Sequence, residues 1–83
     1  MAIKIHPHAE ERMWERGASE EEVLRTVEGG ERFPAKFSRI GYRRNFTFDG
    51  LWKGKQYKTK QVEVYAVEEN EDLIVVTILV KYF

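Results

Sequence analysis

The chain has 83 residues, no cysteine, a formal net charge of zero and 34% charged residues. This length fits a single domain, residues 1–83, with a small hydrophobic core, and the lack of cysteine excludes disulfides and thiolate metal sites. No apolar run is long enough to cross a bilayer, and the N-terminus lacks the apolar region of a signal peptide. We therefore expect a cytoplasmic protein with no membrane partner.

The first predicted element is a helix that begins at Pro7 and ends at Gly17. Proline suits the first turn because its missing N–H is not needed there, and glycine tolerates the left-handed conformation that ends many helices. Ala9 and Met13 lie four residues apart and should face the core. Trp14 is interpreted as a core or dimer residue.

The polar side of this helix holds chemically capable groups. His8, Glu11, Arg12 and Glu15 fall within one arc, and Arg16 lies at its edge. Metal-independent RNA cleavage needs a base, an acid and a cation, which His8, Glu11, Arg12 and Arg16 can supply as catalytic residues. The alternative is a solvated helix on which the arginines offset the charge of the glutamates.

His6 and His8 also suggest a metal site, but no third ligand is fixed beside them. The sequence shows no phosphate-binding glycine loop and no zinc pattern. We therefore expect neither a metal nor a cofactor.

A second helix should begin at Ser19, because Ser19 and Glu22 have the spacing of a capping box. Gly29 and Gly30 should end it. Its apolar residues recur with helical spacing and should form a buried stripe of Val23, Leu24 and Val27.

After the second helix the apolar period changes to two, which indicates strands. We expect a weak edge strand interrupted by Pro34, a turn at Ile40–Gly41, a loop from Asp49 through Gly54, and strands at residues 31–38, 42–48, 57–67 and 73–83. The even positions of the last strand are all apolar and should share one face. The predicted fold is α+β (ααββββ): two N-terminal helices packed on one face of a four-stranded antiparallel sheet.

The charges are unevenly distributed along the chain. Residues 31–60 carry nine Lys or Arg against two Asp or Glu, whereas the flanks carry four against seven and one against five. Aromatic residues alternate with these cations, as in proteins that bind single-stranded RNA. The predicted RNA-binding residues are Arg43, Arg44, Lys58 and Lys60 for phosphates, and Trp52 or Tyr57 for base stacking.

A twisted hairpin with a core of aromatics and solubilising lysines would give the same composition. A Trp52 that packs its loop onto the sheet would look the same in sequence. Both interpretations of the basic segment stay open at this point.

The stretch His8-Ala9-x-Glu11-Arg12-Met13-x-Glu15-Arg16-Gly17, followed by Ser19-Glu20-Glu21-Glu22-Val23, resembles the opening of the DUF4258 proteins of bacteria and archaea. Val62-Glu63-Val64 and Ile74-Val75-Val76-Thr77 resemble the last two strands of that family. The family is similar to the RelE/ParE-like and BrnT-like toxin folds. The family pattern falls on His8, Arg12, Arg16, Gly17 and Thr77 of this chain.

The resemblance implies a RelE-like fold and an RNA-binding endoribonuclease of toxin–antitoxin type, which acts on RNA or the ribosome and is held silent by an antitoxin. The alternative is a non-enzymatic module whose sheet docks a partner protein or forms a homodimer, with aromatic residues as anchors.

Overall fold

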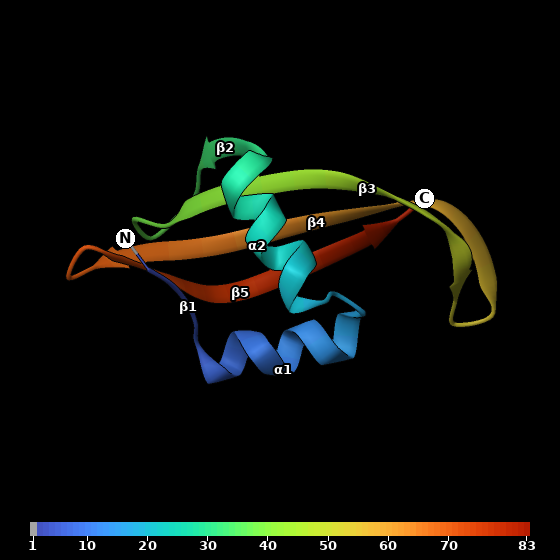
Figure 1. The fold of residues 1–83 in the computed structure, drawn as a ribbon, viewed down its shortest axis with the longest axis horizontal. Helices are drawn as coiled ribbons and strands as arrows, with labels where there is room; N and C mark the ends of the chain where they lie inside the picture. Colours follow the sequence, from blue (N-terminus) through green and yellow to red (C-terminus); the bar gives the residue numbers. More distant parts are fainter. Residues whose placement is uncertain (1) are drawn as a thin grey trace.

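Five strands and two helices make up residues 2–83, which the computed structural model describes (Figure 1). In chain order they are β1 (Ile3–Ile5), α1 (Pro7–Arg16), α2 (Glu20–Gly29), β2 (Glu31–Pro34), β3 (Ile40–Trp52), β4 (Lys55–Glu69) and β5 (Asp72–Tyr82). The sheet order is β1-β5-β4-β3-β2. Only β1 within this part of the chain runs parallel to its neighbour, β5. Neither helix of residues 2–83 is long and apolar enough to span a membrane.

The predicted four-stranded antiparallel sheet, with the order ααββββ, is wrong, although the α+β class is correct. The missing strand is β1, which precedes the helices and pairs Ile3 with Leu73. The His6 N–H continues this pairing by donating to Val75 O at 2.9 Å. Three residues are too few to show a period of two, and the partner lies at the far end of the chain, so local sequence gave no signal.

The helix boundaries follow the predicted caps. Gly17 ends α1 with φ of 80°, and the Gly17 N–H donates to Met13 O. At the start of α2 both capping-box hydrogen bonds form: Glu22 N–H donates to the Ser19 hydroxyl and Ser19 N–H donates to Glu22 Oε1. The predicted boundaries at Pro7, Gly17 and Gly29 are therefore confirmed.

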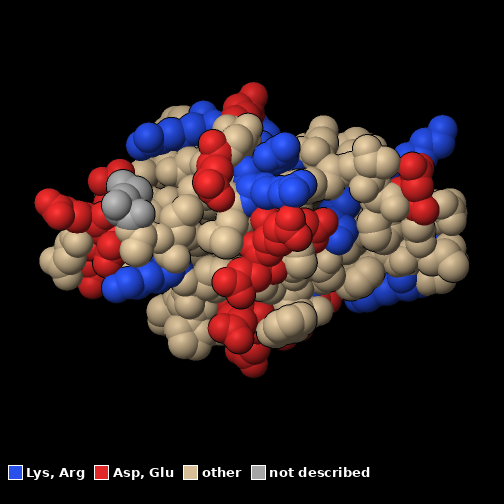
Figure 2. All heavy atoms as spheres, in the orientation of Figure 1, with Lys and Arg blue, Asp and Glu red and all other residues tan. Residues whose placement is uncertain are grey.

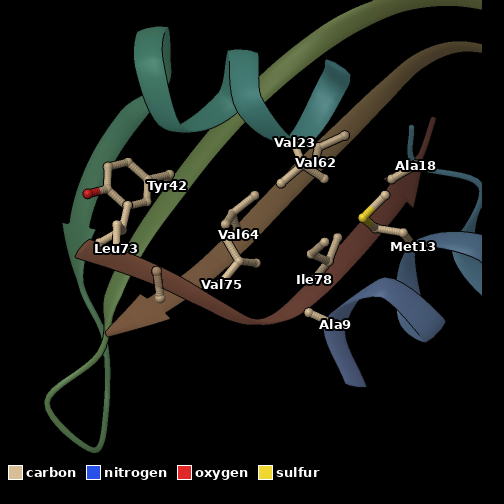
Figure 3. Packing of buried hydrophobic residues seen from close by; sticks show 11 residues of the cluster. Ala9, Met13, Ala18, Val23, Tyr42, Val62, Val64, Leu73, Val75 and Ile78 are labelled. Carbon is tan, nitrogen blue, oxygen red and sulfur yellow. The ribbon is translucent and has the colours of Figure 1, made fainter. Parts of the chain in front are cut away.

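The core lies between the two helices and one face of the sheet (Figure 3). Its buried members are Ala9, Met13, Ala18, Val23, Tyr42, Val62, Val64, Ala66, Leu73, Val75 and Ile78. Ala9 and Met13 project from α1 toward β5, as predicted. In the predicted stripe of α2, Val23 is buried while Leu24 and Val27 are half-buried. Thr26 is also fully buried, and its hydroxyl donates to Glu22 O, which offsets the cost of burying a polar group.

Strand β5 contains a bulge that the sequence pattern did not show. Tyr65 pairs with Thr77, but Ala66 pairs with Val75, so Val76 has no partner on β4. The extra residue exchanges the two faces of the strand. As a result Leu73 and Val75 face the helices together with Ile78, and the prediction that all even positions share one face is wrong.

Strand β3 is longer than expected. The turn predicted at Ile40–Gly41 and the loop predicted from Asp49 are wrong, because β3 runs from Ile40 to Trp52 across an irregularity between Thr47 and Gly50. The turn of the hairpin lies at Lys53 and Gly54. We call residues 48–59 the hairpin arm, which curves beyond the C-terminus at the right of Figure 1.

Candidate nucleic-acid interface

The four residues predicted to be catalytic lie on α1, but they do not form one site with the basic strands. His8 and Glu11 are exposed, and Arg12 donates to Glu15 at 2.9 Å. Arg16 Nη1 donates to Ile78 O at 2.5 Å, which ties α1 to β5. Arg43, one of the cations predicted to bind phosphates, lies on the face of the sheet opposite the helices, beside Phe33.

The residues predicted to bind RNA are divided between two faces. Arg44 reaches the helix layer and donates to Arg25 O at 3.0 Å. Lys60 is buried beneath the turn between the helices, where its ammonium donates to Gly17 O at 2.7 Å and lies 3.1 Å from Glu22 Oε1. Lys58 is exposed. Arg43 and Arg44 therefore point to opposite sides of the sheet.

The aromatic residues of the hairpin arm pack within the molecule. Trp52 stacks on Tyr82, with ring centroids 4.8 Å apart and planes inclined by 14°. Tyr57 lies against the same ring at 5.7 Å. The Tyr82 hydroxyl donates to Arg16 O at 2.8 Å, and burial, followed by the charge of Glu22, raises the pKa of Tyr82. Trp52 thus holds the arm against the body of the protein, as the packing alternative described.

The face of the sheet opposite the helices is not covered by any element within residues 2–83; we call it the open face. Strand register aligns its side chains in rows across β2, β3, β4 and β5. One row is Phe33, Gly41, Tyr65 and Thr77, and the next is Glu31, Arg43, Glu63 and Leu79.

Gly41 allows an aromatic platform to form on the open face. A Cβ atom at Gly41 would clash with Phe33 Cε2, so the Phe33 ring occupies the space that a side chain would need. The ring therefore reaches across β3 to Tyr65, with centroids 6.0 Å apart in an edge-to-face arrangement. The Arg43 guanidinium carbon lies 4.6 Å from the centre of the Phe33 ring.

An open groove of about 470 Å³ adjoins this platform, within the range of roughly 300–1,000 Å³ found for ligand sites. It is mainly apolar, and two cations are among its lining residues. The lining includes Phe33, Lys36, Phe37, Arg39, Tyr65 and Leu79. Phe37 is 83% exposed, so its ring is available to a partner.

Glu63 is a carboxylate with 4% exposure at the centre of the open face. The Tyr65 hydroxyl donates to Glu63 Oε1 at 3.0 Å. Lys81 Nζ lies 3.3 Å from Oε2, which is close enough for an ion pair but does not give an aligned hydrogen bond. Within residues 2–83, Oε2 therefore has no hydrogen-bond donor.

Two neighbours of Glu63 have shifted pKa values. Burial, and then the hydrogen bond to Glu63, raise the pKa of Tyr65. A hydrogen bond from Arg43 to Glu31, at 2.6 Å, raises the pKa of Arg43. Both residues therefore stay protonated at neutral pH, and the open face presents a phenol and a guanidinium beside the carboxylate.

Sequence reasoning identified Arg43 but missed Phe33, Glu63, Tyr65 and Lys81 as members of one site. A usable signal was present in β4, where Glu63 and Tyr65 alternate with the apolar Val62, Val64 and Ala66. Strand alternation places such a carboxylate on the face of the sheet opposite the core. The contact between Phe33 and Tyr65 depends on the register of β2, β3 and β4, which local sequence does not predict.

The face that carries the helices is acidic at its centre. Figure 2 shows Asp and Glu side chains running as a belt over the two helices. Exposed glutamates on these helices are Glu10, Glu11, Glu15, Glu20, Glu21 and Glu28. Such a belt repels phosphates and other anions.

A family model described as "Domain of unknown function (DUF4258)" matches residues 5–80. A comparison with curated proteins and one with solved structures each found no match.

Proposed function

Since the chain belongs to the DUF4258 family, whose function is unknown, we propose a function on the basis of the geometry: it binds single-stranded RNA on the open face of its sheet. The observation that carries this proposal is the Arg43 guanidinium, stacked on Phe33 beside Tyr65 on a sheet face that no helix covers. Unpaired bases stack on such rings, and phosphates pair with such cations.

The distribution of charge also favours the open face as the RNA-binding surface. Lys36, Arg39, Arg43 and Lys81 lie on or beside the open face, where Arg43 is paired with Glu31 and Lys81 with Glu63, whereas exposed glutamates form a belt over the helices. A strand of RNA that lies across β2, β3 and β4 would meet cations and avoid the belt. Duplex DNA suits the site less well, because its bases are stacked and are not free to lie on Phe33.

We expect Arg43→Ala to weaken RNA binding, because it removes a phosphate contact. The slope of log affinity against log salt should decrease by about 0.7, the value for one phosphate contact on a single strand. Fluorescence anisotropy with a labelled, mixed-sequence single-stranded RNA measures both quantities. Arg25→Ala is the matched control, because Arg25 is exposed on α2 and pairs with Glu21.

The control should bind RNA like the unchanged protein. Equal weakening by the two substitutions would mean that binding depends on total charge and not on the open face. Absence of any RNA binding would end the proposal.

The apolar groove favours a second candidate, a docking site for a partner protein. Phe37 is 83% exposed and Leu79 is 38% exposed, and both line the groove. An antitoxin or a second copy of the chain would then cover the open face, as in the toxin–antitoxin role that the family resemblance implied. A dimer that is insensitive to salt and that does not bind RNA would support this candidate over the first.

A further inference from the structure

A second groove on the open face holds polar side chains in place of aromatic rings; we call it the polar groove. Its volume is about 430 Å³, and its lining residues are Glu31, Arg43, Arg44, Asn45 and Gln61. Strand register places Asn45 opposite Gln61, and alternation along β3 puts Asn45 on the same face as Arg43 and Gly41. Arg43 therefore lies between the polar groove and the aromatic platform over Gly41.

Asn45 and Gln61 are joined by one hydrogen bond. Gln61 Nε2 donates to Asn45 Oδ1 at 2.9 Å, which sets the orientation of both amide groups. The pair still offers the N–H groups of Asn45 Nδ2 as donors and Gln61 Oε1 as an acceptor, since neither atom has a hydrogen-bond partner in the part of the chain that the structure describes. Asn45 is exposed and Gln61 is half-buried, so a ligand in the polar groove can reach both amides.

This combination of groups suits a base better than a phosphate. The oxygens of a phosphodiester accept hydrogen bonds and donate none, so a surface that binds only the RNA backbone needs donors alone. Base edges carry donors and acceptors side by side, and unpaired RNA bases present these edges to proteins. Gln61 Oε1 is an uncharged acceptor that a donor on the ligand must satisfy, and the exocyclic amine of a base is such a donor.

The dimensions of the sheet allow neighbouring nucleotides to bind on either side of Arg43. A strand rises about 3.3 Å per residue, so Gly41 and Asn45 lie about 13 Å apart with Arg43 midway between them. The line from Phe33 on β2 through Arg43 on β3 to Gln61 on β4 crosses three strands. One base stacked on Phe33, a phosphate on Arg43 and a second base in the polar groove would lie along this line.

On the basis of the proposed RNA binding, we propose that Asn45 and Gln61 select adenine at the position next to the base that stacks on Phe33. Side-chain amides pair with adenine through two hydrogen bonds, in which N7 accepts and the N6 amine donates. Here Asn45 Nδ2 donates to N7, and the N6 amine donates to Gln61 Oε1. Guanine has acceptors at both places, N7 and O6, and would leave Gln61 Oε1 covered without a donor. The pyrimidines have no N7.

The test uses short labelled RNAs that are runs of uridine and differ only at one central position, which holds adenosine, guanosine, cytidine or uridine. Fluorescence anisotropy measures the affinity of each RNA. The unchanged protein should bind the adenosine RNA about tenfold more tightly than the uridine RNA, which is within the discrimination that a contact of two hydrogen bonds provides.

Asn45→Ala and Gln61→Ala should each reduce the preference for adenosine to less than about twofold, because each removes one of the two hydrogen bonds. The slope of log affinity against log salt should stay the same in both variants, whereas Arg43→Ala should reduce it, since only Arg43 contacts a phosphate. Gln56→Ala is the matched control, because Gln56 is an exposed amide on the same strand but in the hairpin arm. It should keep the preference of the unchanged protein.

Equal affinity for the four RNAs, a preference for another base, or a preference for adenosine that survives both amide substitutions would overturn this proposal and leave the proposed function intact. A protein that binds none of the RNAs would end both.

Discussion

At the scale of single residues, Gly41 determines which aromatic side chains meet on the open face. Its missing side chain lets the Phe33 ring lie across β3 and meet Tyr65. The sequence pattern predicts a turn at Gly41, because glycine is common in turns. In a strand, however, glycine often marks a place where another group approaches closely, and here that group is an aromatic ring.

We expect Gly41→Val to destabilise the protein by about 1–3 kcal/mol, the usual cost of adding atoms to a packed site. The new side chain would displace Phe33 from Tyr65 and should also weaken RNA binding. Urea denaturation gives the free energy of unfolding. Thr47→Val is the control, because Thr47 is exposed on the same strand. A Gly41→Val protein as stable as the control would show that the ring is free to move aside.

At the scale of elements, the helices were predictable and the sheet was only partly so. Both ends of each helix depend on residues within a few positions of the end, such as Ser19 with Glu22, so short-range pattern located them. Strand β1 depends on pairing with β5 across the whole chain. The candidate site was predictable only in part for the same reason. The charge of Arg43 identified it from sequence, whereas its contact with Phe33 depends on the register between β2 and β3.

We expect Asp72 to stabilise the pairing of β1 with β5. Hydrogen bonds from Lys4 and from the Ala2 N–H lower the pKa of Asp72 below its ordinary value of 3.8. This stabilisation is therefore fully present above that value and is lost as the pH falls through the lower pKa of the folded state. We expect Asp72→Asn to reduce protection of the His6 amide, which donates to Val75 O, near neutral pH.

Hydrogen exchange followed by NMR measures this protection. In the unchanged protein the same amide should lose protection on acidification, whereas in Asp72→Asn it should respond less. The amide of Val64, which lies on β4 between β3 and β5, is the internal reference. Identical protection of β1 in the two proteins would exclude a role for Asp72.

At the scale of the whole molecule, the hairpin arm is joined to the helices through aromatic contacts. Trp52 stacks on Tyr82, and both lie close to Gly17, the residue that ends α1. Lys60 adds a buried ammonium that donates to Gly17 O. The arm, the C-terminal part of β5 and the turn between the helices therefore form one packed unit, and most of the basic segment's aromatics serve the fold.

Trp52→Ala should detach the arm and lower the free energy of unfolding by about 1–3 kcal/mol, less than for a fully buried tryptophan because Trp52 is half-buried. Thermal or urea unfolding measures the change. Trp14→Ala is the matched control, since Trp14 is 72% exposed on α1 and its loss should change stability by no more than about 0.5 kcal/mol. Equal losses in the two variants would mean that the arm is not held by Trp52.

Val76 is one residue more than a regular strand would need at this place, because the neighbours Ala66 and Tyr65 pair with Val75 and Thr77. Removing Val76 would make Val75 and Thr77 consecutive and restore regular alternation, so Leu73, Val75 and Ile78 would all stay on the helix face. A single deletion should therefore be tolerated at Val76, whereas a deletion of Leu79 would turn the residues after it to the other face of the sheet. Alignments of related chains should accordingly place gaps at Val76 more often than elsewhere in this strand.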